Sequence, residues 1–153
     1  MQPSDKHSWS HRDKFVVPFL QPNSSVIDYG CGHKDILNYY NPKYYIGLDL
    51  NPDADVIVDL NKYIPEYSGY DYALVLGVLE YLDKPFEFIN LVKNTAKTFI
   101  ILNFLREQKK PEWQQTFTLE QVMQEYNNIF DSVLNYKVIN KYDIFLCRGI
   151  KWK

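Results

Sequence analysis

A short apolar run that ends in two closely spaced glycines constrains the fold of this chain more than any other feature. Residues 26–29, Val-Ile-Asp-Tyr, lead directly into Gly30 and Gly32. Such a run before a turn is typical of a buried strand, and glycines let a ligand approach the backbone without meeting a Cβ atom. Asp49 ends the next apolar run, where a carboxylate can accept hydrogen bonds from both hydroxyls of a ribose. Alone, either feature would also fit a tight turn or a helix cap, but together they predict a cofactor site in a βαβ unit.

The sequence that follows continues to alternate between strand and helix patterns. The run at 72–76 is apolar without alternation, as expected of a central parallel strand covered on both faces. Pro18 argues against a regular helix throughout the amphipathic segment 11–20. The expected strands are 26–29, 44–49, 55–59, 72–76 and 98–104, and the expected helices are part of 11–20, a crossover helix beginning at 35–40, and 86–95.

The C-terminal third predicts one more helix and a hairpin. Thr118 with Gln121 forms a capping-box pattern at a helix start, and two strands near 132–139 and 143–148 would pair around 140–142. We therefore expect a single α/β domain over 1–153, with residues 1–8 frayed. Its core would be a Rossmann-like, doubly wound, mostly parallel seven-stranded sheet with an antiparallel C-terminal strand and helices on both faces.

Composition narrows the functional classes. The chain has 153 residues, 46% hydrophobic and 24% charged, and this balance is typical of one compact globular domain. A formal net charge of -2 gives no general attraction to phosphate backbones, so no nucleic-acid partner is expected. No apolar stretch approaches the roughly 18 residues of a membrane span. Cys31 and Cys147 with no secretory signal pattern predict neither a disulfide framework nor export, and hence a cytoplasmic location.

Four segments resemble, in order, the motifs of class I S-adenosylmethionine-dependent methyltransferases, in a small single-domain form like methyltransferase type 11. Residues 28–32, Asp-Tyr-Gly-Cys-Gly, resemble the first motif, D-x-G-C-G-x-G. Residues 47–49, Gly-Leu-Asp, are similar to the second motif, and Asp59-Leu60 to the third. Residues 71–82 resemble the fourth, F-D-x-V-x-x-x-x-V-L-E-H-L, and 117–120 resemble more weakly a helix start of many relatives. The resemblance covers roughly residues 15–150.

This resemblance implies S-adenosylmethionine as cofactor and S-adenosylhomocysteine as product. It implies that Asp49 binds the ribose, and that the Asp59 side chain and the following amide contact the adenine. The cofactor-binding residues it implies are Asp28, Gly30, Cys31, Gly32, Asp49, Leu50, Asp59, Leu60 and Leu76. Cys31 itself is interpreted as a small packed residue rather than a nucleophile, because no histidine partner and orienting acid accompany it.

The sequence departs from the family pattern at three places. Lys34, preceded by His33, replaces the third glycine of the first motif, which makes this loop less permissive and puts its contacts to the methionine end in question. Tyr81 replaces the histidine that often follows the fourth-motif glutamate. The Pro-Gly-Gly turn that normally precedes the fifth strand is absent at 94–98.

No catalytic residue stands out from the sequence. A sulfonium is already an activated methyl donor, so a general base is needed only if the acceptor must lose a proton. Weak candidates are His33, Glu80 and Tyr81, and His7 and His11 are weaker still. His33 fits better as a polar residue at the cofactor rim, and Glu80 fits equally well as a helix cap. No metal site is predicted, although a lone carboxylate-bound Mg²⁺ stays open.

Three functions compete at this stage. The preferred one is methyl transfer to a small-molecule, sugar or carrier-bound acceptor, an expectation based on the small size of the chain. The alternative is a catalytically degenerate methyltransferase fold that serves as a binding or scaffold protein. A nicotinamide-dependent dehydrogenase is disfavoured because its G-x-G-x-x-G motif would need glycine at Asp35. Substrate specificity would lie in the first 20 or so residues and in 106–115, which include Trp113. The methylated atom and the oligomeric state are not predicted.

Overall fold

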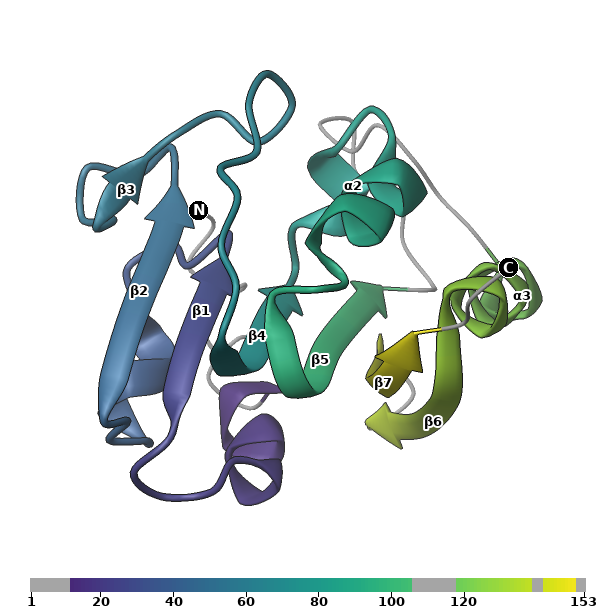
Figure 1. Ribbon diagram of the computed structural model, residues 1–153, viewed down its shortest axis with the longest axis horizontal. Coiled ribbons are helices and arrows are strands. Elements are labelled where there is room, and N and C mark those ends of the chain that lie inside the picture. Colours follow the sequence, from purple (N-terminus) through teal and green to yellow (C-terminus); the bar gives the residue numbers. More distant parts are fainter. Residues whose placement is uncertain (1–11, 106–117, 139–141, 151–153) are drawn as a thin grey trace.

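One mixed sheet organises the chain. The computed structural model describes residues 12–105, 118–138 and 142–150, and within them seven strands pair in the order β3-β2-β1-β4-β5-β7-β6 (Figure 1). β1 to β5 are parallel, and β7 runs antiparallel to both β5 and β6. The predicted Rossmann-like sheet with an antiparallel C-terminal strand is therefore confirmed. Residues 1–8, expected to be frayed, and most of the predicted hairpin turn lie outside the described residues.

The element bounds follow the sequence patterns closely. The strands are β1 Ser25–Tyr29, β2 Tyr44–Asp49, β3 Val56–Ile57, β4 Tyr70–Leu76, β5 Ala96–Leu105, β6 Phe130–Val138 and β7 Tyr142–Ile150. The helices are α2 Pro85–Val92 and α3 Leu119–Ile129, with 3-10 turns η1 Val17–Phe19, η2 Asp35–Asn38 and η3 Leu79–Tyr81. Residues 12–16 form a further helical turn before η1. No described helix combines the length and apolar character needed to cross a bilayer.

Two segments are less regular than the sequence predicted. The expected crossover helix after residue 35 is only the 3-10 turn η2, which follows a left-handed Lys34 and ends where Tyr39 leaves helical geometry at φ -122°. The expected strand 55–59 pairs over only two residues, opposite the last two residues of β2, and Asp59 then begins a turn in which its side chain accepts the Asn61 amide. The helix in 11–20 tightens into η1 at Pro18, whose ring cannot accommodate a continuing α-helix.

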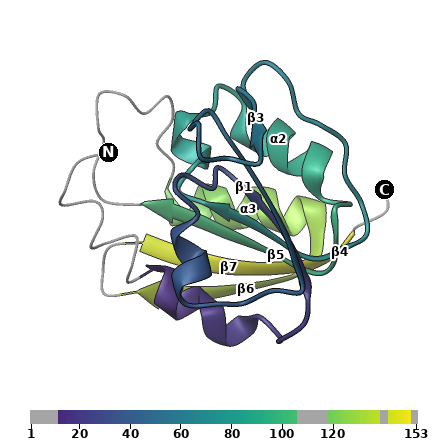
Figure 2. The same ribbon diagram turned by 90° about the vertical axis from the view of Figure 1, so that its left-hand side faces the viewer.

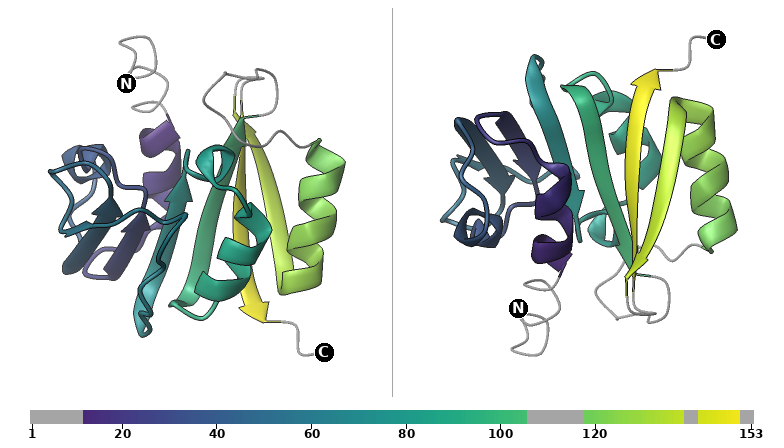
Figure 3. Two further views of the ribbon diagram at one scale, coloured as in Figure 1. Left: turned by 90° about the horizontal axis from the view of Figure 1, so that it is seen from above. Right: turned by 90° about the horizontal axis from the view of Figure 1, so that it is seen from below.

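Successive residues of each strand point to opposite faces of the sheet, and both faces are apolar and covered. On one face Ile27 and Tyr29 of β1 pack in a cluster with α2 and α3 side chains such as Phe88 and Tyr126. On the other face Val26 packs with Val16, Leu20 and Ile36 from the N-terminal turns. Figures 2 and 3 show α2 and α3 on one side of the sheet and the residues around 12–19 on the other. Burial on both faces explains why the central strands read as continuous apolar runs.

The start of α3 carries the predicted capping box. Thr118 Oγ1 accepts the Gln121 amide at 3.1 Å, and Gln121 Oε1 accepts the Thr118 amide at 2.9 Å. These two bonds satisfy amide groups that a helix start otherwise leaves without an intrahelical partner.

Thr118→Ala removes the side-chain acceptor of this box, so we expect the free energy of unfolding to fall by about 1 kcal/mol. Gln124→Ala is the matched control, because Gln124 is an exposed glutamine of the same helix and lies outside the cap. Denaturant unfolding followed by circular dichroism measures both changes. Equal stability of the Thr118→Ala variant and the unmodified protein would contradict a stabilising cap.

Candidate functional site

A cavity of about 300 Å³ opens at the carboxyl ends of β1, β2 and β4. β1 lies between β2 and β4, so the chain order reverses at this point, and such reversal points are where open α/β sheets form ligand crevices. The turns after all four of the first strands contribute to its wall. The nine residues implied by the sequence resemblance all line it: Asp28, Gly30, Cys31, Gly32, Asp49, Leu50, Asp59, Leu60 and Leu76.

The two glycines of the turn after β1 have different structural roles. Both have positive φ, +75° at Gly30 and +55° at Gly32, a conformation that favours glycine. A Cβ atom on Gly30 would lie 2.8 Å from the Cβ of Val78, so this residue permits the close approach of the turn after β4. A Cβ on Gly32 would meet none of the described atoms within 4 Å. Gly32 therefore presents open backbone to the cavity.

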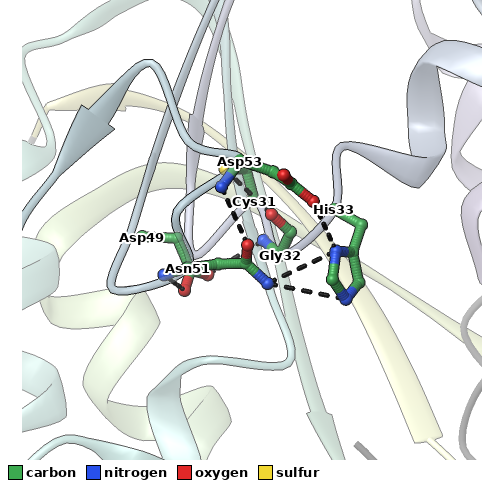
Figure 4. Close-up of polar contacts among 6 residues, drawn as sticks. All are labelled: Cys31, Gly32, His33, Asp49, Asn51 and Asp53. Atoms are coloured by element: carbon green, nitrogen blue, oxygen red, sulfur yellow. Dashed lines mark hydrogen bonds and ion pairs between the residues drawn. The ribbon is translucent and has the colours of Figure 1, made fainter.

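Asp49 joins this turn to the loop after β2. Its Oδ2 accepts the Gly32 amide at 2.8 Å, and its Oδ1 accepts the Asn51 amide at 2.9 Å (Figure 4). A carboxylate oxygen has two acceptor positions, so each oxygen retains capacity for a ligand hydroxyl. The residue predicted as the ribose acceptor thus lines the cavity and also fixes the turn.

His33 lies at the cavity rim within a polar network. Its Nδ1 lies 2.8 Å from Asp53 Oδ2, and the Asn51 side-chain amide nitrogen lies 3.4 Å from the same Nδ1 (Figure 4). The Asp53 amide in turn donates to Asn51 Oδ1 at 2.9 Å. With 46% of its side chain exposed, His33 fits the rim interpretation better than a catalytic one.

Asp28 is a buried carboxyl in the wall of the cavity. Burial raises its pKa to about 7, against the opposing effect of the Tyr45 hydroxyl, which donates to Asp28 Oδ2 at 2.7 Å. The negative charge of Asp13 raises the pKa further. At neutral pH this carboxyl therefore exchanges between the neutral and charged forms, and a nearby cation would favour the charged form.

Arg12 and Asp13 are lining residues that the sequence analysis missed. Both are largely buried, and Arg12 Nη2 lies 3.2 Å from Asp13 Oδ1. Burial raises the pKa of Asp13, although the Arg12 charge opposes this rise. The helix in 11–20 was predicted from its apolar residues alone. The sequence feature that could have identified these two residues is the pair of adjacent opposite charges just before the apolar residues of that helix.

The remaining predicted residues differ in whether they line the cavity. Cys31 packs against β2, where a Cβ on Gly47 would lie 2.7 Å from its Sγ, and burial raises its thiol pKa to about 12. This supports the interpretation of Cys31 as a packed residue. Tyr81 lines the cavity and is 37% exposed. Glu80 is buried in η3 and is not among the lining residues. His7 and His11 lie outside the described residues.

Comparison with known proteins gives matches at the level of structure. No family model matches the chain, and no curated protein matches it by sequence. A possible exported protein from Bordetella parapertussis has a TM-score of 0.73 at 14% identity, over 96% of this chain and 68% of that chain. Magnesium protoporphyrin IX methyltransferase from Synechocystis, with bound S-adenosylhomocysteine, has a TM-score of 0.68 at 14% identity, over 97% and 89%.

A S-adenosylmethionine-dependent methyltransferase from Archaeoglobus fulgidus has a TM-score of 0.67 at 15% identity, over 93% of this chain and 94% of that chain. At identities this low, these TM-scores establish a shared fold and nothing more specific. Because nearly the whole chain is covered, the likeness extends beyond one βαβ unit. The chain therefore has the Rossmann-like fold of class I S-adenosylmethionine-dependent methyltransferases.

Proposed function

We propose that this protein is a S-adenosylmethionine-dependent methyltransferase whose cofactor occupies the cavity at the ends of β1, β2 and β4. The observation that carries the proposal is the direct bond between the Gly32 amide and Asp49, which brings the open turn and the ribose acceptor to one point. The magnesium protoporphyrin IX methyltransferase of Synechocystis, which shares the fold, was solved with S-adenosylhomocysteine and with S-adenosylmethionine. We also propose that the chain forms one domain, and a cytoplasmic location remains a prediction.

The charges around the cavity suit the parts of this cofactor. Asp49 would accept the ribose hydroxyls, and Asp59 with Leu60 would contact the adenine at the β3 end of the wall. Elsewhere in the wall, the opposite charges of Arg12 and Asp13 complement an amino acid, which carries both a carboxylate and an ammonium group. A positively charged sulfur next to them would favour the ionised form of Asp28.

In this reaction the residues of the chain would mainly position the methyl acceptor and exclude water from the site. When bound, S-adenosylmethionine supplies a methyl group that its sulfonium already activates. The wall residues would hold the acceptor in line with that methyl group, which is the main contribution that a site of this type makes. If the acceptor must lose a proton, His33 and Tyr81 are the lining residues among the sequence candidates, and the burial of Glu80 outside the lining disfavours it.

We propose a small-molecule, sugar or carrier-bound acceptor, with no nucleic acid and no membrane as partner. The absence of net positive charge supports this choice. The alternative is a scaffold that binds the cofactor without turnover. Two observations on the catalytic candidates support this alternative: Glu80 lies outside the cavity wall, and the His33 ring already contacts Asp53.

The first test is cofactor binding. Isothermal titration with S-adenosylhomocysteine should show saturable binding, and Asp49→Asn should weaken it by about tenfold or more, because one charged acceptor for ribose hydroxyls is lost. Asp131→Asn is the matched control, since Asp131 is an exposed acid of β6 that does not line the cavity. Unchanged affinity in Asp49→Asn, or no binding by the unmodified protein, would contradict the proposal.

The pH dependence of binding gives a second test. The raised pKa of Asp28, about 7, means that the free site holds a proton below that pH. A sulfonium favours the carboxylate, so affinity for S-adenosylmethionine should rise by up to about tenfold per unit as pH increases toward 7 and then level off.

Tyr45, Asp13, Arg12 and Asp49 also influence the charge of Asp28, so the control keeps them and changes only the carboxyl. Asp28→Asn should flatten the profile, and S-adenosylhomocysteine, which lacks the sulfonium charge, should show a weaker pH dependence in the unmodified protein. An equally steep profile in Asp28→Asn would assign the titration to another group.

Turnover separates the enzyme from the scaffold. Incubation with methyl-labelled S-adenosylmethionine and fractionated cell extract should transfer label to metabolites or carrier-bound intermediates, and untargeted mass spectrometry should find the matching one-methyl shift in cells that contain the protein. Label confined to RNA or protein would overturn the acceptor proposal. Tight cofactor binding without transfer to any fraction would favour the scaffold.

A further inference from the structure

Lys34 occupies a backbone conformation that suits glycine. Its φ is +61° and its ψ is +38°, in the left-handed region that side chains with a Cβ atom rarely adopt. Among the described residues other than glycine, Asn23 is the one other case of positive φ, and asparagine tolerates this region well. Lysine does not, so an interaction of its side chain or backbone must hold it there.

The side chain of Lys34 makes such an interaction. Its Nζ lies 2.6 Å from Asp55 Oδ1, and 23% of the lysine side chain is exposed. The other oxygen of Asp55 accepts the Gly47 amide at 2.8 Å, and the Asp55 amide donates to the Gly47 carbonyl at 3.0 Å. Lys34 is therefore tied through Asp55 to the middle of β2. The contact with Lys34 also lowers the pKa of Asp55, which keeps the acid charged.

This ion pair is one of several contacts between two loops. We call residues 30–35 the first loop and residues 49–55 the second loop. Gly32 contacts Asp49, His33 contacts Asp53 and Lys34 contacts Asp55. The residues on both sides of Lys34 line the cavity, whereas Lys34 itself does not. A change at Lys34 would therefore act on a ligand without direct contact, and the conformation of the first loop is the structural link between them.

We propose that Lys34 is a positioning residue for the cofactor: its ion pair with Asp55 holds the first loop in the left-handed conformation that a glycine would adopt unaided, and so keeps the Gly32 backbone and its bond to Asp49 in place at the cavity wall. This inference rests on the proposed function. It explains how the loop keeps an open turn although the third glycine of the motif is missing. The sequence alone suggested only that this loop would be less permissive.

The test compares variants that separate charge from conformation. Lys34→Met keeps the length and the left-handed cost of the side chain but removes the charge, while Lys34→Gly removes both. Asp55→Asn removes the partner charge yet keeps an oxygen for the Gly47 amide. Lys84→Met is the control, since Lys84 pairs with Glu87 at 3.9 Å on an exposed helix start. Two readouts are used: the Kd for S-adenosylhomocysteine, and hydrogen exchange of the Gly32 amide in the ligand-free protein.

Lys34→Met and Asp55→Asn should each weaken S-adenosylhomocysteine binding by about fivefold and speed Gly32 exchange by a similar factor, the scale expected of a partly exposed ion pair. Lys34→Gly should stay within about twofold of the unmodified protein, because glycine adopts the same φ without strain. Lys84→Met should change neither readout. Exchange of core amides such as Ile101 should not change in any variant, which separates a local role from general destabilisation.

If Lys34→Met has the same affinity and the same Gly32 exchange rate as the unmodified protein, the positioning role is overturned. Equal losses in Lys34→Gly and Lys34→Met would overturn the conformational argument, since the charge would then matter for itself. If the unmodified protein binds neither S-adenosylmethionine nor S-adenosylhomocysteine, the proposed function fails. Gly32 exchange in the ligand-free variants would still decide whether Lys34 positions the loop.

Discussion

The attachment of the turn after β1 to the end of β2 is the constraint on which the rest of the site depends. The amides of Gly30 and Cys31 both donate to the Leu48 carbonyl, at 2.7 and 3.1 Å, and the next amide, that of Gly32, donates to Asp49. These bonds attach the loop after β1 to the end of the parallel strand β2. A helix therefore does not begin directly after β1. On the side of β4, Val78 packs so closely against this turn that a Cβ atom on Gly30 would lie 2.8 Å from its Cβ.

Burial of acids is the energetic counterpart of this geometry. Asp13 and Asp28 lose most of their contact with water, and burial raises the pKa of each carboxyl. Their ionised forms are therefore unfavourable unless a positive charge is near. Arg12 supplies part of that charge for Asp13. The wall as a whole remains acidic, because Asp35, Asp49 and Asp59 also line it, and a cationic ligand would therefore stabilise it.

The sequence predicted most of the sheet and the glycine turn, for physical reasons that also explain what it missed. Apolar runs identify strands covered on both faces, and a glycine pair before a strand-ending acid identifies a crevice. The prediction of a crossover helix was wrong, because the left-handed Lys34 is followed by a single 3-10 turn. Hydrophobic periodicity in a sequence carries no information about a left-handed backbone residue. Arg12 and Asp13 were missed because their burial depends on packing against distant strands. The Lys34 to Asp55 pair depends on the register of two loops, which local patterns do not encode.

The buried acids bear on ligand binding, which the enzyme and the cofactor-binding scaffold share. A fold that binds no ligand gains nothing from carboxyls held away from water, and each such group lowers the stability of the fold when it ionises. Strained or poorly solvated groups are expected where binding or chemistry repays the cost. Here the buried Asp13 and Asp28 and the open Gly32 line one cavity, and the left-handed Lys34 lies in the loop between two further lining residues. That convergence favours a site built for a cationic ligand, and a sulfonium nucleoside combines the positive charge with the ribose that Asp49 is placed to hold.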